Sequence, residues 1–307
     1  MKLLKQGSKG PEVVKLQKLL KITPDGDFGP MTHKAVVRFQ MHNELHPDGI
    51  VGNITWSMLL HAPRLSNEAI DEDTDVRSQY FTTHFDQTIH RHYLDSDEYL
   101  KKPGKNEYFF LHHTAGGSNP YNCIDQWNRD SRGRIATEFV LGGQDHRTGN
   151  DEHDGIMVQA FPEEGYGWHL GKTGSGYMNK HSIGIEICSM GYLDNEDRTY
   201  VGSKVTDNQI ITLEEAFKGK LKWHKYSDKQ IDELHKLILY IQDRDQIDMR
   251  IGLQQFIKKY GPTKAFEFQE DAYYGKIKGL LSHTNVRKTK MDVYPDPRLI
   301  DVIMSIK

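Results

Sequence analysis

Several segments of this chain carry side chains that could bind a metal ion or transfer protons. His112 and His113 follow the apolar run of residues 108–111, which predicts a buried strand. Because adjacent strand residues point to opposite faces, only one of the two histidines can join a given metal site. A buried histidine pair satisfied by hydrogen bonds is the alternative.

Carboxylates and a further histidine lie later in the chain. Glu186 lies inside the apolar run 183–187, where a charge costs several kcal/mol unless it is paired or near a metal. Glu186 is therefore a candidate for acid–base chemistry, with a salt-bridged core glutamate as the alternative. His283 and Asp292 flank a basic, turn-like stretch. The chain has 16 histidines, so such pairs also arise by chance, and their spacing alone leaves a metal role open.

A sheet is needed to bring these segments together. Short apolar runs predict strands at residues 108–111, 138–141, 156–161 and 181–187. Ser227 and Gln230 have the spacing of a capping box, and apolar residues follow at helical spacing, which predicts a helix packed on that sheet. Segments 191–225 and 250–275 are expected to be irregular insertions, the second of them a lid or part of a substrate groove.

A repeat organises the N-terminal part of the chain. The pattern D-G-x-apolar-G-x-x-T occurs at residues 25–32 and again at 48–55. Each copy predicts a tight turn that leads into a helix, because Asp-Gly suits the turn and Pro30 fits a first helical position. Apolar residues at helical spacing complete a small three-helix module over residues 1–62. Periodicity alone would also suit a helical cap or a dimerisation unit.

The motifs of this module are more specific than its periodicity. They are G-S-x-G-x-x-V-x-x-L-Q-x-x-L at residues 7–20, the two repeat copies, A-V-x-x-F-Q at 35–40 and T-W-x-x-L at 55–59. This set resembles the peptidoglycan-binding module found beside many cell-wall hydrolases. The resemblance implies that the module binds bacterial peptidoglycan.

A second resemblance covers roughly residues 105–190 and 225–305. The order F-L-H-H-T-A-G, G-W-H, S-I-G-I-E-I and S-H-x-x-V-R-x-x-K-x-D is similar to the zinc-dependent N-acetylmuramoyl-L-alanine amidase type 2 family. That family includes bacteriophage endolysins and animal peptidoglycan recognition proteins. The resemblance implies an α+β or α/β fold, with a mixed β-sheet flanked by helices and one zinc ion in a surface groove.

The same resemblance assigns roles to individual residues. Zinc ligands fall on His112, His283 and Asp292, with His113 as the rival to His112. The catalytic residues fall on Glu186 and Lys290, while Thr137 occupies the position where some members carry a catalytic tyrosine. Val293-Tyr294-Pro295 follows Asp292 where many members have Pro-Gly-Pro. The candidates for substrate binding are His113, Thr137, Trp168, His169 and Asn179.

The implied activity is hydrolysis of the amide bond between N-acetylmuramic acid and the L-alanine of the stem peptide. Three protein ligands leave a fourth zinc position for water, whose pKa zinc lowers to about 7 so that it can act as the nucleophile. Two other functions stay open: a recognition protein that binds peptidoglycan without cleaving it, and a zinc peptidase acting on the stem peptide. The H-x-E-x-x-H-type motif of common peptidases is absent.

Length and composition set the remaining expectations. A chain of 307 residues suggests two domains, here 1–62 and 106–307, joined by a linker with a peripheral helix at 63–105. The net charge of −3 argues against a nucleic-acid partner, two cysteines exclude a disulfide scaffold, and no apolar run could cross a membrane. The N-terminus lacks the apolar stretch of a signal peptide. We therefore expect synthesis in the cytoplasm and action on the wall after release or delivery, which favours a phage or prophage endolysin over an injected effector.

Overall fold

The computed structural model describes residues 3–42, 49–52, 55–56, 59 and 85–307. The chain divides into two compact units, Met1–Asp73 and Thr74–Lys307. The first 22 residues of the expected linker, 63–84, lie outside the described part, as do Asp48, Asn53 and Ile54 of the second repeat copy. Each unit is therefore considered by itself.

The first unit contains α1 (Pro11–Leu19) and α2 (Pro30–His42). Gln17 of α1 binds the first repeat copy: its Oε1 accepts a hydrogen bond from the Gly26 amide at 2.8 Å. Its Nε2 donates to the Asp27 carbonyl at 3.0 Å and to Thr32 Oγ1 at 2.9 Å. The glutamine thus ties the turn to both helices.

Gln40 of α2 makes the same contacts with the second copy. Its Oε1 accepts from the Gly49 amide at 2.8 Å, and its Nε2 donates to the Ile50 carbonyl at 2.8 Å and to Thr55 Oγ1 at 3.3 Å. Thr55 is helical in the described part, as the repeat predicts. The sequence repeat is therefore also a repeat of hydrogen bonds. The core that it encloses consists of Leu4, Val13, Leu16, Phe28, Val36, Val51, Trp56 and Leu59.

A six-stranded sheet forms the centre of the second unit, with strand order β1-β5-β4-β7-β3-β10. Its strands are β1 (His90–Arg91), β3 (Tyr108–His113), β4 (Phe139–Leu141), β5 (Met157–Gln159), β7 (Ser182–Ile187) and β10 (Gly279–Ser282). Strands β4, β7, β3 and β10 run parallel, so their carboxyl ends meet at one edge. Strand β5 is antiparallel to β4, which makes the sheet mixed, as expected.

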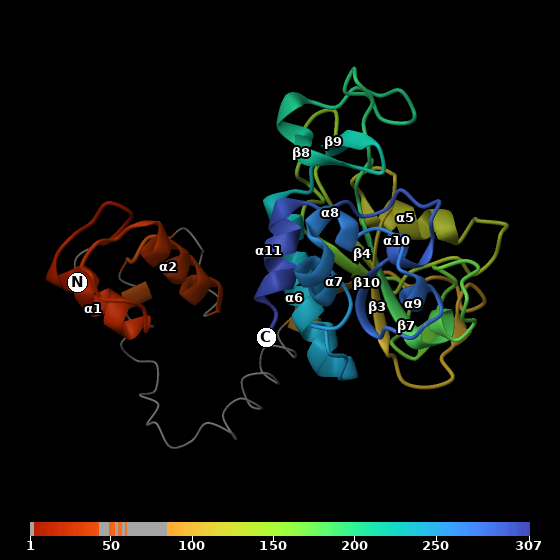
Figure 1. Cartoon of the computed structure of the whole chain (residues 1–307), viewed down its shortest axis with the longest axis horizontal. Helices are drawn as coiled ribbons and strands as arrows, with labels where there is room; N and C mark the ends of the chain where they lie inside the picture. The colour runs from red at the N-terminus through yellow and green to blue at the C-terminus, as the bar shows by residue number, and fades with distance from the viewer. Residues whose placement is uncertain (1–2, 43–48, 53–54, 57–58, 60–84) are drawn as a thin grey trace. The chain divides into compact units, whose positions relative to one another are not determined.

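Helices cover both faces of this sheet (Figure 1). The longest is α6 (Asp228–Asp245), whose start has the predicted capping box between Ser227 and Gln230. It packs with α11 (Pro297–Ser305) on the face that carries Phe109 and Leu111. On the opposite face, Ile124 of α5 (Pro120–Trp127) packs against Val140. Within the described residues, no helix combines the length and apolarity that crossing a membrane requires.

The expected linker 63–105 needs correction at its C-terminal end. Strand β1 joins the sheet by pairing in parallel with β5, and β2 (Leu100–Lys101) pairs with β6 (Gly165–Tyr166). Both β1 and β2 are two residues long, which is too short to show an alternating apolar pattern that would predict a strand. Residues 85–88 are helical, which agrees with a peripheral helix before β1.

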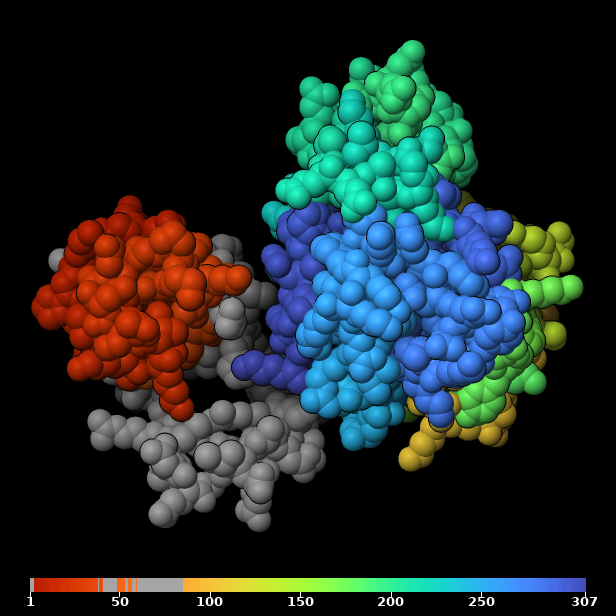
Figure 2. Space-filling model, in the orientation of Figure 1, coloured from red at the N-terminus to blue at the C-terminus, as the bar shows by residue number. Residues whose placement is uncertain are grey.

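Segment 191–225 is more regular than expected. It contains a short 3-10 turn (Asp207–Gln209) and a hairpin of β8 (Ile210–Phe217) and β9 (Lys220–His224). Lys218 and Gly219 form its tip, both with positive φ. Figure 2 shows this segment, in green and teal, as a lobe that projects from the body of the unit. The second insertion contains α7 (Leu253–Tyr260), α8 (Pro262–Ala265) and α9 (Glu270–Tyr273).

Candidate metal centre

Two histidines and one aspartate converge at the carboxyl edge of the parallel strands. His112, His283 and Asp292 each offer one ligand atom, and these atoms lie within 4.8 Å of one another. Nδ1 of His283 is 3.0 Å from Nδ1 of His112 and 2.5 Å from Oδ2 of Asp292. All three residues are buried. They form the one His/Cys/Asp/Glu group of this kind in the described part of the chain.

Regular structure positions both histidines. His112 is near the carboxyl end of β3, and His283 is the first residue of α10 (His283–Val286), directly after β10. A capping box between Ser282 and Asn285 fixes this strand-to-helix turn. Asn285 also donates to the Ala265 carbonyl at 2.8 Å, so the second insertion braces the helix that carries His283.

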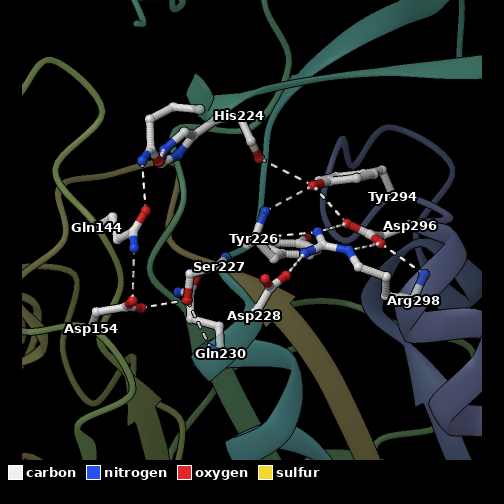
Figure 3. Close-up of polar contacts among 11 residues, drawn as sticks. Gln144, Asp154, His224, Tyr226, Ser227, Asp228, Gln230, Tyr294, Asp296 and Arg298 are labelled. Carbon is white, nitrogen blue, oxygen red and sulfur yellow. Dashed lines mark hydrogen bonds and ion pairs between the residues drawn. The ribbon is translucent and has the colours of Figure 1, made fainter. Parts of the chain in front are cut away.

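Asp292 lies in a loop that an aromatic stack holds in place. The ring of Tyr294 is stacked between Trp223 of β9, at 4.9 Å, and Tyr226, at 4.6 Å. Its hydroxyl donates to the His224 carbonyl at 3.1 Å and accepts from the Tyr226 amide at 3.2 Å (Figure 3). The first insertion therefore helps to fix the position of Asp292, two residues before Tyr294.

The outer nitrogens of both histidines also have partners. Nε2 of His112 is 2.8 Å from Nδ1 of His169, and Nε2 of His169 is 2.8 Å from the hydroxyl of Ser182. Nε2 of His283 faces the carbonyl of Leu170 at 3.4 Å. If both ligand histidines carry their proton on Nε2, these contacts are satisfied and both Nδ1 lone pairs point into the cluster.

The cluster has the electrostatics of a cation site. Burial and the neighbouring His283 lower the pKa of His112 well below its usual value, which keeps that imidazole neutral. Burial opposes ionisation of Asp292, but the adjacent His283 outweighs it and lowers the pKa of the carboxyl group. Oδ2 of Asp292 is buried, and the Nδ1 atom that lies 2.5 Å from it has no proton to donate when His283 is protonated on Nε2. A buried, unsatisfied carboxylate oxygen beside two imidazole nitrogens suits a bound cation.

Glu186 lies next to this cluster in the sheet. It pairs with His112 in the parallel register of β7 and β3, so the two side chains share a face. Its Oε2 is buried without a hydrogen-bond partner. Burial, reinforced by the Asp292 carboxylate, raises the pKa of Glu186 well above its usual value, while the positive charge of Lys290 acts in the opposite direction. A carboxyl group whose pKa is raised in this way is suited to proton transfer.

The other candidate residues predicted from the sequence lie outside the cluster of His112, His283 and Asp292. His113 is buried on the opposite face of the sheet, with Nδ1 3.4 Å from the hydroxyl of Tyr226, so the structure does not bring it to the cluster. The hydroxyl of Thr137 donates to the Phe139 carbonyl at 2.8 Å. Trp168 is exposed and packs edge-on against Tyr166. Lys290 is exposed, two residues before Asp292.

Asn179 and Gly184 support the cluster without joining it. Asn179 is buried and bonds to the backbone of residues 169–171. A Cβ atom at Gly184 would lie 2.9 Å from Nδ1 of His169 and 2.7 Å from Cγ2 of Thr137, so the absence of a side chain makes room for His169.

Sequence reasoning missed the supporting roles of Ser182, Gly184 and Tyr294. Ser182 and Gly184 belong to the S-I-G-I-E-I motif, and a search for close-packing positions there could have found them.

Family models match both units of the chain. One described as N-acetylmuramoyl-L-alanine amidase matches residues 102–264, more than half of the chain. Another, described as a putative peptidoglycan binding domain, matches residues 9–59. His283 and Asp292 lie beyond the residues of the first match. Their proximity to His112 is therefore an observation independent of that match.

Individual proteins match different shares of the chain. An uncharacterized protein in the bpoA1 3' region of Kitasatospora aureofaciens is 57% identical over 35 residues, which are 11% of this chain and 30% of that protein. A peptidoglycan-binding protein from Clostridioides difficile, solved in complex with glutamine hydroxamate, is 38% identical over 19% of this chain and 40% of its own, with a TM-score of 0.19. The PlyG catalytic domain is 14% identical over 66% of this chain and 82% of its own, with a TM-score of 0.36.

Proposed function

Because the chain belongs to the N-acetylmuramoyl-L-alanine amidase family, we propose that it cleaves the amide bond between N-acetylmuramic acid and the L-alanine of the stem peptide in bacterial peptidoglycan. The observation that carries this proposal is the convergence of His112, His283 and Asp292 beside Glu186. Side chains that could bind a metal and a carboxyl group that could transfer protons lie together at one edge of the sheet, which is the combination that amide hydrolysis requires.

The donor set fits zinc. Two imidazole nitrogens and one carboxylate oxygen are common zinc ligands, and three protein ligands leave a coordination position open. The unsatisfied Oδ2 of Asp292 supports the fit, because a cation would compensate this buried oxygen. When bound, zinc polarises the amide carbonyl and makes a water molecule more acidic.

Glu186 and Lys290 supply the proton transfer and the charge stabilisation. Glu186 accepts the proton of the attacking water at Oε2, which has no other hydrogen-bond partner, and returns it to the departing amine. Its raised pKa suits both steps. Lys290 acts on the negative charge that develops on the carbonyl oxygen, and its position close enough to influence the pKa of Glu186 supports this role.

The first unit serves as an anchor on the polymer in this proposal. Its match to a peptidoglycan-binding model supports a role in attachment. A tethered catalytic unit meets its substrate at a higher local concentration. The lytic role of a phage or prophage endolysin, acting on the wall after release from the cytoplasm, accords with this combination of units.

Digestion of purified peptidoglycan tests the activity. The full chain is incubated with the polymer, with a chelator, and with the chelator followed by zinc, and the products are identified by mass spectrometry. We expect stem peptides that begin with L-alanine, lost on chelation and restored by zinc. The variant Asp292→Ala should lose bound zinc and activity together, because one ligand is removed.

Other products would identify another function. Fragments cut within the peptide would make the protein a peptidase, and saturable binding that leaves the wall uncleaved in the presence of zinc would make it a recognition protein. Either result would overturn the proposal. Comparing the full chain with residues 74–307 on insoluble wall tests the anchor, and equal binding by the two would remove that role.

A further inference from the structure

We propose that Asn179 is a positioning residue for the metal centre, because its side chain holds the two residues that support both ligand histidines. The inference rests on the proposed zinc site and concerns what keeps its ligands in place. Asn179 is 2% exposed, directly after the buried Met178 and within a 3-10 turn (Met178–His181) that precedes β7. It does not touch His112 or His283 through any hydrogen bond in the described structure.

A single amide group fixes three consecutive backbone residues. Oδ1 of Asn179 accepts from the amides of His169, at 3.2 Å, and Leu170, at 3.0 Å. Nδ2 donates to the carbonyl of Gly171 at 3.2 Å. No aspartate or leucine of the same size can make all three bonds, because one lacks the donor and the other lacks both groups.

The residues fixed in this way are those that face the ligands. His169 places Nδ1 2.8 Å from Nε2 of His112, and Leu170 places its carbonyl 3.4 Å from Nε2 of His283. The Leu170 carbonyl can only accept, so it selects the tautomer of His283 whose Nδ1 is free to bind a metal, and a His169 ring protonated on Nε2 does the same for His112. Asn179 therefore acts on both ligands through one dipeptide.

Arg287 also binds the backbone of the loop that contains residues 169–172. Nη1 of Arg287 donates to the Lys172 carbonyl at 2.9 Å and lies 3.4 Å from the Leu170 carbonyl. Arg287 is only partly buried, and its contacts leave the amides of His169 and Leu170 to Asn179. Loss of Asn179 should thus release the backbone amides of His169 and Leu170, while Arg287 still contacts the Leu170 carbonyl.

Zinc affinity tests this role independently of turnover. The dissociation constant of zinc is measured by chelator competition for the full chain and for Asn179→Ala. Partners outside the ligand set typically change metal affinity about 10- to 100-fold, and we expect a loss in this range. Cobalt in place of zinc should show an altered absorption spectrum in the variant, which a uniform loss of stability would not produce.

A matched control separates positioning from folding. Asn106 is another buried asparagine of the same unit, and its Nδ2 donates to Asp245 at 2.6 Å. Asn106→Ala should lower the free energy of unfolding and leave zinc affinity unchanged. If Asn179→Ala does not fold, Asn179→Asp keeps the size and the Oδ1 acceptor and loses the donor to Gly171; it should bind zinc more weakly than the unaltered chain.

A measurement without metal completes the test. Imidazole nitrogen NMR of the zinc-free chain reports which nitrogen of His112 and His283 carries the proton, and Asn179→Ala should mix the two tautomers. Unchanged tautomers and unchanged zinc affinity would overturn the inference. If the unaltered chain binds no zinc, the proposed metal centre fails, while the tautomers still decide the role of Asn179.

Discussion

Glu186 stands directly opposite His112 in the parallel register of β7 and β3, and both side chains face the same side of the sheet. The pairing places a carboxyl group of raised pKa beside a metal-ligand candidate without making it a member of the ligand cluster. The proposed proton-transfer group and one of the proposed metal ligands thus lie on neighbouring strands.

This separation predicts that zinc binding and turnover can be uncoupled. Glu186→Gln should retain zinc and lose turnover by about 10²- to 10⁴-fold, because the amide cannot transfer the proton. Metal analysis and the release of stem peptides from purified wall measure the two properties. Glu152 is exposed, and Glu152→Gln is the control that should change neither. Full activity of Glu186→Gln would mean that another group moves the proton.

The close approach at Gly184 makes a second prediction. Gly184→Ala should lower the free energy of unfolding by about 1–3 kcal/mol, because the new methyl group meets Thr137 and His169. Thr137→Ser removes the nearer of these contacts and should recover part of the loss when combined with Gly184→Ala. Urea unfolding measures all four proteins of this cycle.

Gly176 provides the control for that substitution. A Cβ atom there would meet no atom within 4 Å, so Gly176→Ala should leave the steric environment unchanged. If Gly184→Ala and Gly176→Ala lower the free energy of unfolding equally, the contacts at Gly184 do not contribute to stability.

The doubled hydrogen bonds of the first unit give a third prediction. Gln17→Ala and Gln40→Ala should each destabilise that unit by about 1–3 kcal/mol, because buried donors and acceptors lose their partners. The amides of Gly26 and Gly49 donate to these side chains, so their hydrogen exchange reports the loss directly. Gln6 is exposed, and Gln6→Ala should leave both exchange rates unaltered. Unchanged exchange in the first two variants would contradict the prediction.

The fourth prediction concerns stability in acid. Burial, followed by the nearby His146 and His113, lowers the pKa of His224 to about 3. The unfolded chain therefore takes up a proton at this histidine near pH 6.5 while the folded chain does not, so stability is lost as pH falls from about 6.5 towards 3. One such proton changes the free energy of unfolding by about 1.4 kcal/mol per pH unit.

Substitution of His224 isolates its share of this slope. His224→Gln should flatten the dependence of the free energy of unfolding on pH by about one proton between pH 4 and 6. Urea unfolding of the zinc-free proteins across this range provides the comparison, and other buried histidines contribute equally to both. Parallel curves would mean that His224 titrates alike in the folded and unfolded chains.

Local patterns predicted much of the scaffold. The apolar runs before His112 and around Glu186 are strands, and Ser227 with Gln230 begins α6 as its capping box indicated. These features depend on neighbouring residues, which a sequence displays directly. The hairpin of β8 and β9 was missed although Lys218-Gly219 marks its turn, because the polar residues around it concealed the alternation.

Which residues could do chemistry was determined by the sequence itself: the pair His112 and His113, the carboxylate in S-I-G-I-E-I, and the late His283 and Asp292. Their assembly was decided only by tertiary structure. Alternation places His112 and His113 on opposite faces, but only the packing against Tyr226 and the register with Glu186 decide which face holds the cluster. The support from Asn179 through residues 169–171 likewise arises from contacts that no local spacing encodes, since chain closure brings distant segments together.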